Sequence, residues 1–219
     1  MSFHRFRLLF LFLMVTPLPL TSFAQRAAAV NAALTPYKVY QGGGNIGEEK
    51  GGRVCFVYGL AEHCWNAEDG FSEIEAKPIK LPSGGRLLLV TALSLGGSDG
   101  TLDLVLLDEQ NQQPMNLLPH VELASANAGL WEYWQMENLS PMPIIVTADP
   151  VWSDDNVSNA EEGSHSHEFA INAYFFDKAT VQYIDQVNYV TSRKYSGGND
   201  VILLEKPTII AKLKGTAIK

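Results

Sequence analysis

Apolar and polar residues alternate along short runs from residue 53 to the C-terminal end, and Gly, Pro, Asn or Asp separates one run from the next. Alternation with a period of two places successive side chains on opposite faces of a β-strand. In residues 168–176, Phe169, Ile171, Ala173 and Phe175 fall on one face. No stretch sustains a convincing amphipathic helix beyond about ten residues, which is short of the usual globular helix. The pattern therefore predicts an all-β, mainly antiparallel fold with little helix, a β-sandwich of the jelly-roll-like kind.

Segments with this pattern recur at a spacing of roughly 8–12 residues, as they do in sandwiches and barrels. Val105 and Leu107 lie between the alternating leucines of their run and indicate burial on both faces. The apolar residues of Thr180–Thr191 would equally line a helix, so a helix is the competing prediction for this segment. The predicted strands are Arg53–Tyr58, Phe71–Leu81, Arg86–Leu95, Thr101–Asp108, His120–Ala124, Leu130–Glu137, Ile144–Ala148, Ser166–Phe176, Thr180–Thr191, Val201–Lys206 and Thr208–Lys212.

The first 24 residues have the layout of a secretory signal peptide. Arg5 and Arg7 precede the apolar run Leu8–Val15, and a small-x-small sequence ends at Ala24. The run is shorter than the about 20 apolar residues that span a bilayer, so we expect cleavage before Gln25 and no membrane insertion afterwards. The sequence predicts a secreted or periplasmic protein with a signal peptide over 1–24, a flexible Ala- and Gly-rich arm over 25–52 and one β-sandwich domain over 53–219.

The charge balance of the chain limits its partners in a secreted or periplasmic compartment. The chain carries a net charge of −8, and the expected mature chain has 14 basic against 24 acidic residues. So acidic a surface repels phosphate backbones, which argues against nucleic-acid binding.

Cys55 and Cys64 are the only cysteines, and their spacing does not fit C-x-x-C chemistry. They are predicted to form a disulfide that stabilises the fold by about 2–3 kcal/mol.

Two motifs associated with catalysis or nucleotide binding match the sequence but lack the required surroundings. Gly42–Gly47 fits G-x-G-x-x-G, yet further glycines and a strand follow it where a nucleotide site needs a helix. Gly96–Gly100 fits G-x-S-x-G with Ser98 in the nucleophile position, but the next segment again alternates as a strand. A serine hydrolase using Ser98, with His165 or His167 downstream, stays open as an alternative.

Histidines and carboxylates suggest two possible metal sites. His165 and His167 share one face of an extended segment, where Glu168, His63, His120 or Glu162 would complete a zinc or copper site. The loop before them is acidic and includes Asp154 and Asp155, and such loops bind calcium in extracellular β-sandwiches. The calcium spacing motif is absent, so a solvated acidic loop competes with that interpretation, and no cofactor is required by the sequence.

Aromatic residues suggest a binding surface. In the strand Leu130–Glu137, Trp131 and Tyr133 fall on one face and Trp134 on the other. If one of these faces is exposed near Trp152 or Trp65, it would form a platform for a sugar ring or an apolar ligand. Packing of the same residues in the core is the competing interpretation.

Residues 80–108, and above all Thr101–Asp108 with the sequence TLDLVLLD, resemble the jelly-roll modules of bacterial secreted enzymes such as pre-peptidase C-terminal domains. The resemblance implies a β-sandwich with an accessory, non-catalytic role and identifies no functional residue. We therefore expect an exported, non-enzymatic β-sandwich that binds a ligand, a glycan or a protein partner. The alternative is a metal-dependent or serine hydrolase that uses His165 and His167 or Ser98.

Overall fold

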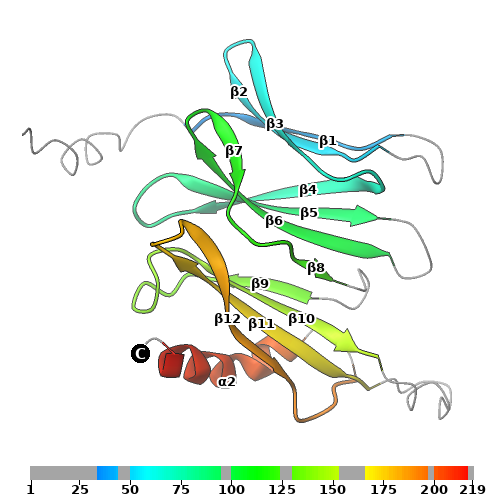
Figure 1. Cartoon of the computed structure of the whole chain (residues 1–219), viewed down its shortest axis with the longest axis vertical. Helices are drawn as coiled ribbons and strands as arrows, with labels where there is room; N and C mark the ends of the chain where they lie inside the picture. Colours follow the sequence, from blue (N-terminus) through cyan, green and yellow to red (C-terminus); the bar gives the residue numbers. More distant parts are fainter. Residues whose placement is uncertain are drawn as a thin grey trace, which may run out of the picture. The chain divides into compact units, whose positions relative to one another are not determined.

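The computed structural model of the chain describes residues 34–43, 50–94, 100–123, 130–152, 166–196 and 200–216. These residues are mostly antiparallel β-sheet, as predicted, and the signal-peptide prediction lies outside them (Figure 1). The elements are β1 Tyr37–Tyr40, β2 Arg53–Tyr58, β3 Ala61–Asn66, β4 Phe71–Lys80, β5 Arg86–Ser94, β6 Thr101–Gln110, β7 Gln113–Asn116, β8 Glu122–Leu123, β9 Leu130–Trp134, β10 Ile144–Val151, β11 Glu168–Asp177, β12 Gln182–Val190 and helix α2 Val201–Thr216.

The strands form three sheets, and each sheet is built from one continuous part of the chain. The first has the order β1-β2-β3, the second β4-β5-β6-β7 with β8 also pairing to β6, and the third β12-β11-β10-β9. Apart from the pairing of β8 with β6, each sheet is an up-and-down meander, a simpler connection than the Greek keys of a jelly roll. A backbone hydrogen bond of 2.8 Å from Tyr183 N to Leu117 O links the third sheet to the chain after β7.

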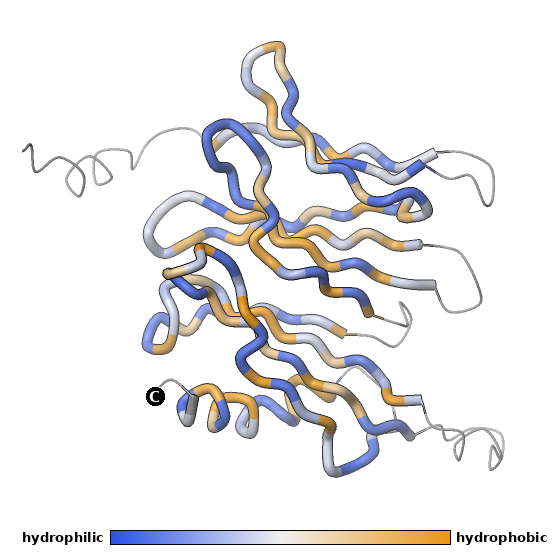
Figure 2. Tube along the Cα trace, in the orientation of Figure 1, coloured by the Kyte–Doolittle hydropathy of each residue, from blue (hydrophilic) through white to orange (hydrophobic). Residues whose placement is uncertain are grey.

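Three apolar cores lie between four layers. The first core joins α2 to the β9–β12 sheet, the second joins that sheet to the β4–β8 sheet, and the third joins the β4–β8 sheet to β1–β3. Both central sheets are therefore buried on both faces, which explains the continuous apolar runs of β5, β6 and β10 (Figure 2). Leu104 and Leu106 enter the second core and Val105 and Leu107 the third, which confirms the two-sided burial expected for β6.

The β1–β3 sheet contains two strands that the sequence did not predict. β1 lies within residues 25–52, where a flexible arm was expected, and its pairing with β2 sets Lys38 opposite Cys55. β3 follows β2 through a tight turn in which Gly59 has a φ of 63°, a conformation that favours glycine. The register of this hairpin places Cys55 directly opposite Cys64, and the two form the predicted disulfide.

The C-terminal segment is the main correction to the predicted secondary structure. Val201–Lys206 and Thr208–Lys212 were expected to be strands, but they belong to one helix, α2, which contains Pro207. Ile202, Ile209 and Leu213 are buried against the third sheet. Their spacing follows a helical face, so covering the sheet outweighs the local strand preference of the β-branched residues. No helix in the described ranges has both the length and the apolar content needed to cross a membrane.

β12 is a strand, and an irregularity explains why its sequence also resembled a helix. Ala173 pairs with Val187, but the next pair is Tyr174 with Asp185, so β12 carries one extra residue at this point. A bulge of this kind reverses the side to which later side chains point. Tyr183 consequently packs in the second core and Val187 in the first, although they are four residues apart as on one helical face.

A buried carboxylate fixes α2 to the neighbouring strand and loop. Glu205 of α2 is 8% exposed and accepts hydrogen bonds from Tyr189 Oη at 2.9 Å and from Tyr195 Oη. Arg193 Nε donates to Tyr195 Oη at 2.6 Å and lies 3.7 Å from Glu205 Oε1. Burial raises the pKa of Glu205, but hydrogen bonds from Tyr195 and Tyr189, together with the charge of Arg193 and a hydrogen bond from Thr208, hold that pKa below its usual range. Glu205 is therefore ionised at neutral pH.

Glu205→Gln is expected to lower the free energy of unfolding at pH 7 by about 1–2 kcal/mol, because hydrogen bonds to a charged acceptor are stronger than those to an amide. A lowered folded pKa stabilises the protein above the usual glutamate pKa, and this stabilisation is lost as the pH falls through the folded pKa. Urea unfolding between pH 7 and pH 3 should therefore show the difference between the two proteins closing at acidic pH. A difference that stays constant with pH would contradict an ionised Glu205.

Candidate functional site

The structure separates the aromatic residues that the sequence grouped as a platform. Trp131 and Tyr133 are half-buried and pack against the second core, and Lys77 Nζ lies 5.3 Å from the Tyr133 ring centroid. Trp134 is buried in the first core, on the opposite face of β9. Trp152 is 58% exposed at the end of β10. These four side chains do not share one surface.

The predicted histidine and acidic-loop sites are mostly outside the described residues. His165, Asp154 and Asp155 fall in residues 153–165, and Ser98 falls in residues 95–99, none of which the structure describes. His167 is described and is 8% exposed, with its ring centroid 4.5 Å from that of Trp152.

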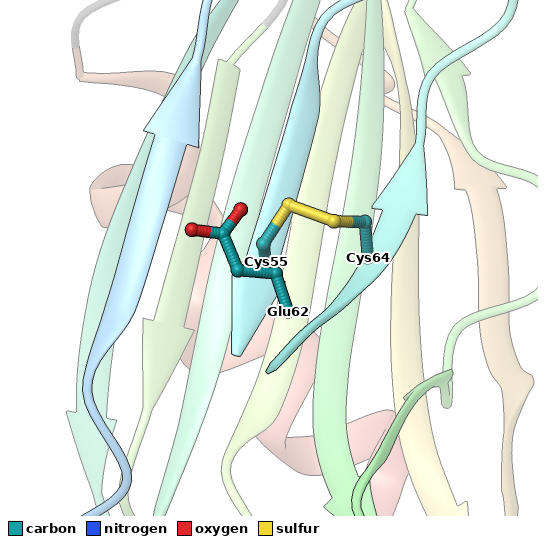
Figure 3. Close-up of side chains that lie close together, drawn as sticks. All are labelled: Cys55, Glu62 and Cys64. Carbon is teal, nitrogen blue, oxygen red and sulfur yellow. A yellow bond between two sulfur atoms is a disulfide. The ribbon is translucent and has the colours of Figure 1, made fainter. Parts of the chain in front are cut away.

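Among the described residues, one group of possible metal ligands lies close together: Cys55, Glu62 and Cys64 (Figure 3). Both sulfur atoms are joined in the disulfide, so neither is a thiolate ligand. The Glu62 carboxylate is also engaged, since it accepts hydrogen bonds from Lys38 Nζ at 2.7 Å and from Tyr40 Oη at 2.9 Å. This group stabilises the β1–β3 sheet and does not form a metal site.

A small polar pocket of about 210 Å³ lies where the β1–β3 sheet meets the β4–β8 sheet. It combines an indole, carboxylates, amides and an imidazole, a set that no single strand supplies. We call it the Asp103 pocket. Its lining residues are Trp65, Asn66, Glu68, Asp103, Val105, Asn116 and His120.

The strands explain how these residues meet. Asp103 and Val105 are two apart on β6 and share the face that points to the third core, against which Trp65 of β3 also packs. Glu68 follows β3 in a turn closed by a 3.1 Å hydrogen bond from Phe71 N to its carbonyl oxygen. His120 precedes β8, and the adjoining residue Val121 is held to β6 by a 2.8 Å bond from Leu104 N.

Two side chains of the pocket are oriented by hydrogen bonds. Asn116 Oδ1 accepts from the backbone N–H groups of Leu106 at 3.2 Å and Leu118 at 3.1 Å, which directs its amide nitrogen as a donor. His120 Nε2 lies 3.3 Å from Glu122 Oε2. Glu122 is the register partner of Asp103 across β6 and β8, so the carboxyl groups of the two strands lie on one face.

The negative charge of Asp103 lowers the stability of the folded protein in this position. Burial raises the pKa of Asp103 above the usual aspartate value, His120 opposes that effect, and Glu68 and Glu122 add to it. Because the folded pKa is raised, the ionised carboxylate of Asp103 is less favourable here than in the unfolded chain, although His120 and a hydrogen bond from the Leu104 backbone partly offset the effect. A destabilising polar group in a pocket is typical of a functional site.

The pocket offers hydrogen-bond acceptors at Glu68 and Asp103, donors at Asn66 and Asn116, and an indole at Trp65. This chemistry suits a neutral ligand with several hydroxyl groups, since each hydroxyl both donates and accepts, and the carboxylates repel anions. Comparisons of the chain with protein-family models, with curated proteins and with solved structures find no match.

Sequence reasoning did not identify Asp103, Glu68 or Asn116 as site residues, and it considered Trp65 and His120 only as additions to other sites. One available signal was Asp103 itself, because this acidic residue interrupts the apolar run Leu102–Leu107, whose central residues are buried. The remaining residues come from β3, the turn after it, β7 and the segment before β8, and only the packing of the sheets brings them together.

Proposed function

We propose that this protein is an exported, non-enzymatic β-sandwich that binds a single neutral sugar ring, free or at the end of a glycan, in the Asp103 pocket. The observation that carries the proposal is the meeting of Trp65 with the carboxylates and amides of the pocket. Stacking on an aromatic face together with oriented polar groups is a general means of binding an amphipathic ring.

The size of the pocket supports a ligand of one ring. Its volume of about 210 Å³ is below the range of about 300–1,000 Å³ typical of sites for drug-sized ligands. The acidic balance of the chain and of the pocket argues against nucleic acid and other polyanions as partners. Export, which the first 24 residues predict, would place the pocket where glycans are accessible.

The test is calorimetric titration of the purified protein with glucose, galactose, mannose, N-acetylglucosamine and short oligomers of each. Asp103→Asn should weaken binding of the preferred sugar by about 10-fold or more, because a buried acceptor of ligand hydroxyls is lost. Asp185→Asn is the matched control: it makes the same change on β12, where burial also raises the pKa of the aspartate. It should leave the affinity unchanged.

A stability measurement separates loss of binding from loss of folding. Because the folded pKa of Asp103 is raised, its charge destabilises the protein at pH 7, and that cost disappears below the unfolded pKa of about 3.9. Asp103→Asn should therefore unfold at higher urea concentration than the wild type at pH 7 and at the same concentration near pH 3. The proposal is wrong if no sugar binds, if both variants lose affinity equally, or if the bound glycan is hydrolysed.

A further inference from the structure

β12 forms one edge of the third sheet, and among the described residues no strand pairs with it on the side away from β11. Thr191 N, directly after β12, donates to Phe169 O at 2.9 Å. Successive residues of an antiparallel pair alternate between bonding to the neighbouring strand and pointing away from it, so Asn188 and Val190 direct their N–H and C=O groups outward. Both residues are exposed, and no hydrogen bond joins these backbone groups to the part of the chain that the structure describes.

The accessible part of this edge is short and has two boundaries. On one side, the extra residue of β12 interrupts the strand, and beyond it Tyr183 N donates to Leu117 O at 2.8 Å. On the other side, the chain bends after Thr191. The regular stretch between these boundaries is Val187–Thr191, which we call the open edge, and Tyr189 is its central residue.

The open edge lacks the features by which proteins usually keep sheet edges from pairing. Edge strands are commonly protected by charged residues and by proline. β4, an edge strand of the second sheet, carries four charged residues and Pro78. Residues 187–191 contain neither a charged residue nor a proline, although the whole chain has a net charge of −8. Another strand can therefore approach the open edge without meeting a charge on it.

A pocket of about 430 Å³ lies beside the open edge, between β12 and α2. Tyr189 and Val190 line it from β12, Leu204 lines it from α2, and both Val190 and Leu204 are about half exposed. Arg193 and Glu205 also line it and form an ion pair of 3.7 Å, so their charges offset each other. A strand added beside β12 would find space here for a large side chain on the face that α2 covers.

We propose that the open edge pairs with the open edge of a second copy of this chain, around a two-fold axis at Tyr189. In this register Asn188 of each copy lies opposite Val190 of the other, and their outward N–H and C=O groups exchange hydrogen bonds. The third sheet then continues from one copy into the other. The two Tyr189 side chains lie on the α2 side of the joined sheet, where the pocket of each copy receives the ring from the other.

A second copy is the occupant that the geometry of the open edge favours. An antiparallel pairing around a two-fold axis makes a surface its own complement. Because Tyr189 has two regular residues on each side, all five residues of the stretch find a partner, and no charge faces a like charge. The interface is small, so we expect an equilibrium between monomer and dimer. The pairing goes beyond the proposed sugar binding and does not depend on it, because the Asp103 pocket lies on other elements.

The test is sedimentation velocity of the full chain up to about 1 mM, where the fraction of dimer should rise with concentration. Val190→Lys should weaken the dimer by about 10-fold or more, because it places two cations diagonally across the axis, about 7–8 Å apart. Ile184→Lys is the matched control. It makes the same change on the same strand at a side chain of similar exposure, 42% against 51%, but outside the open edge, and should leave the equilibrium unchanged.

Val190→Pro tests the backbone directly, since it removes an outward N–H group that β11 does not use, and it too should weaken the dimer. Hydrogen exchange followed by NMR locates the contact: exchange of the Asn188 and Val190 amides should slow as the concentration rises, and exchange of the β4 amides should not. The proposal is overturned if the chain stays monomeric, if Ile184→Lys weakens the dimer as much as Val190→Lys, or if a dimer forms without protecting these two amides.

Discussion

Replacing Ile209 with alanine is expected to lower the free energy of unfolding by about 2–5 kcal/mol, the usual cost of removing a buried Ile side chain beyond Cβ. Ile209 is fully buried between α2 and the β9–β12 sheet, in the core that also contains Phe169 and Ile171. The wide range reflects how far the helix can move into the space left behind. Urea unfolding followed by circular dichroism measures the change.

Leu203→Ala is the matched control on the same helix. Leu203 is 60% exposed, so its truncation should change the free energy of unfolding by no more than about 0.5 kcal/mol. Helix propensity changes little in either variant compared with the loss of a buried side chain. Equal effects of the two substitutions would show that α2 does not cover the sheet through this face, and the four-layer arrangement would then be wrong.

Removing the disulfide is expected to lower the free energy of unfolding by about 2–3 kcal/mol, from the chain entropy regained when the Cys55–Cys64 loop opens. The bond joins β2 to β3 within the outermost sheet, which contributes Val54 and Phe56 to the third core. The double variant C55A/C64A should therefore unfold at lower guanidinium concentration than the oxidised wild type.

Reductant provides the control for the disulfide experiment. It should shift the unfolding midpoint of the wild type towards that of C55A/C64A and leave the variant itself unchanged. Thiol titration of the denatured, unreduced wild type should find no reactive cysteine. Two reactive thiols in that titration, or equal midpoints for the oxidised and reduced wild type, would contradict a structural disulfide.

The strands that the sequence predicted best are those with long apolar or alternating runs, which lie in the central sheets. β5, β6, β10 and β11 contain long apolar or alternating runs, and burial between layers requires those runs whichever strands pair. The pairing of Cys55 with Cys64 was also predictable, because two cysteines allow one intramolecular bond, and residues 1–24 predict a compartment in which it forms.

The errors have physical causes of their own. The β-branched residues of α2 favour a strand locally, and Pro207 divides the segment, yet the outer apolar face of the third sheet is covered by the helical face that contains Ile202, Ile209 and Leu213. β1 and β3 are short strands at the edges of one sheet, so pairing with β2 defines them more than their own composition.

The Asp103 pocket was not predictable for a related reason. Its residues come from β3, a turn, β6, the end of β7 and the segment before β8, and no spacing in the sequence indicates that they meet. The polar residues that the sequence did group, at 165–167 and in the acidic loop, are close in the chain, and this closeness is the only relation between residues that a sequence shows directly.

Apart from β8, which pairs with β6, every strand pairs with a strand next to it in sequence, and this affects how the chain reaches its folded state. Most strands pair with the strand next in sequence, although residues 41–52 between β1 and β2 and residues 152–167 between β10 and β11 form longer connections than hairpin turns. Closing a short loop between two strands loses little chain entropy, and each meander can form independently of the other sheets. The exception is the docking of one sheet on the next, exemplified by the bond between Tyr183 and Leu117. Assembly of the layers, rather than formation of the sheets, should therefore limit the folding rate.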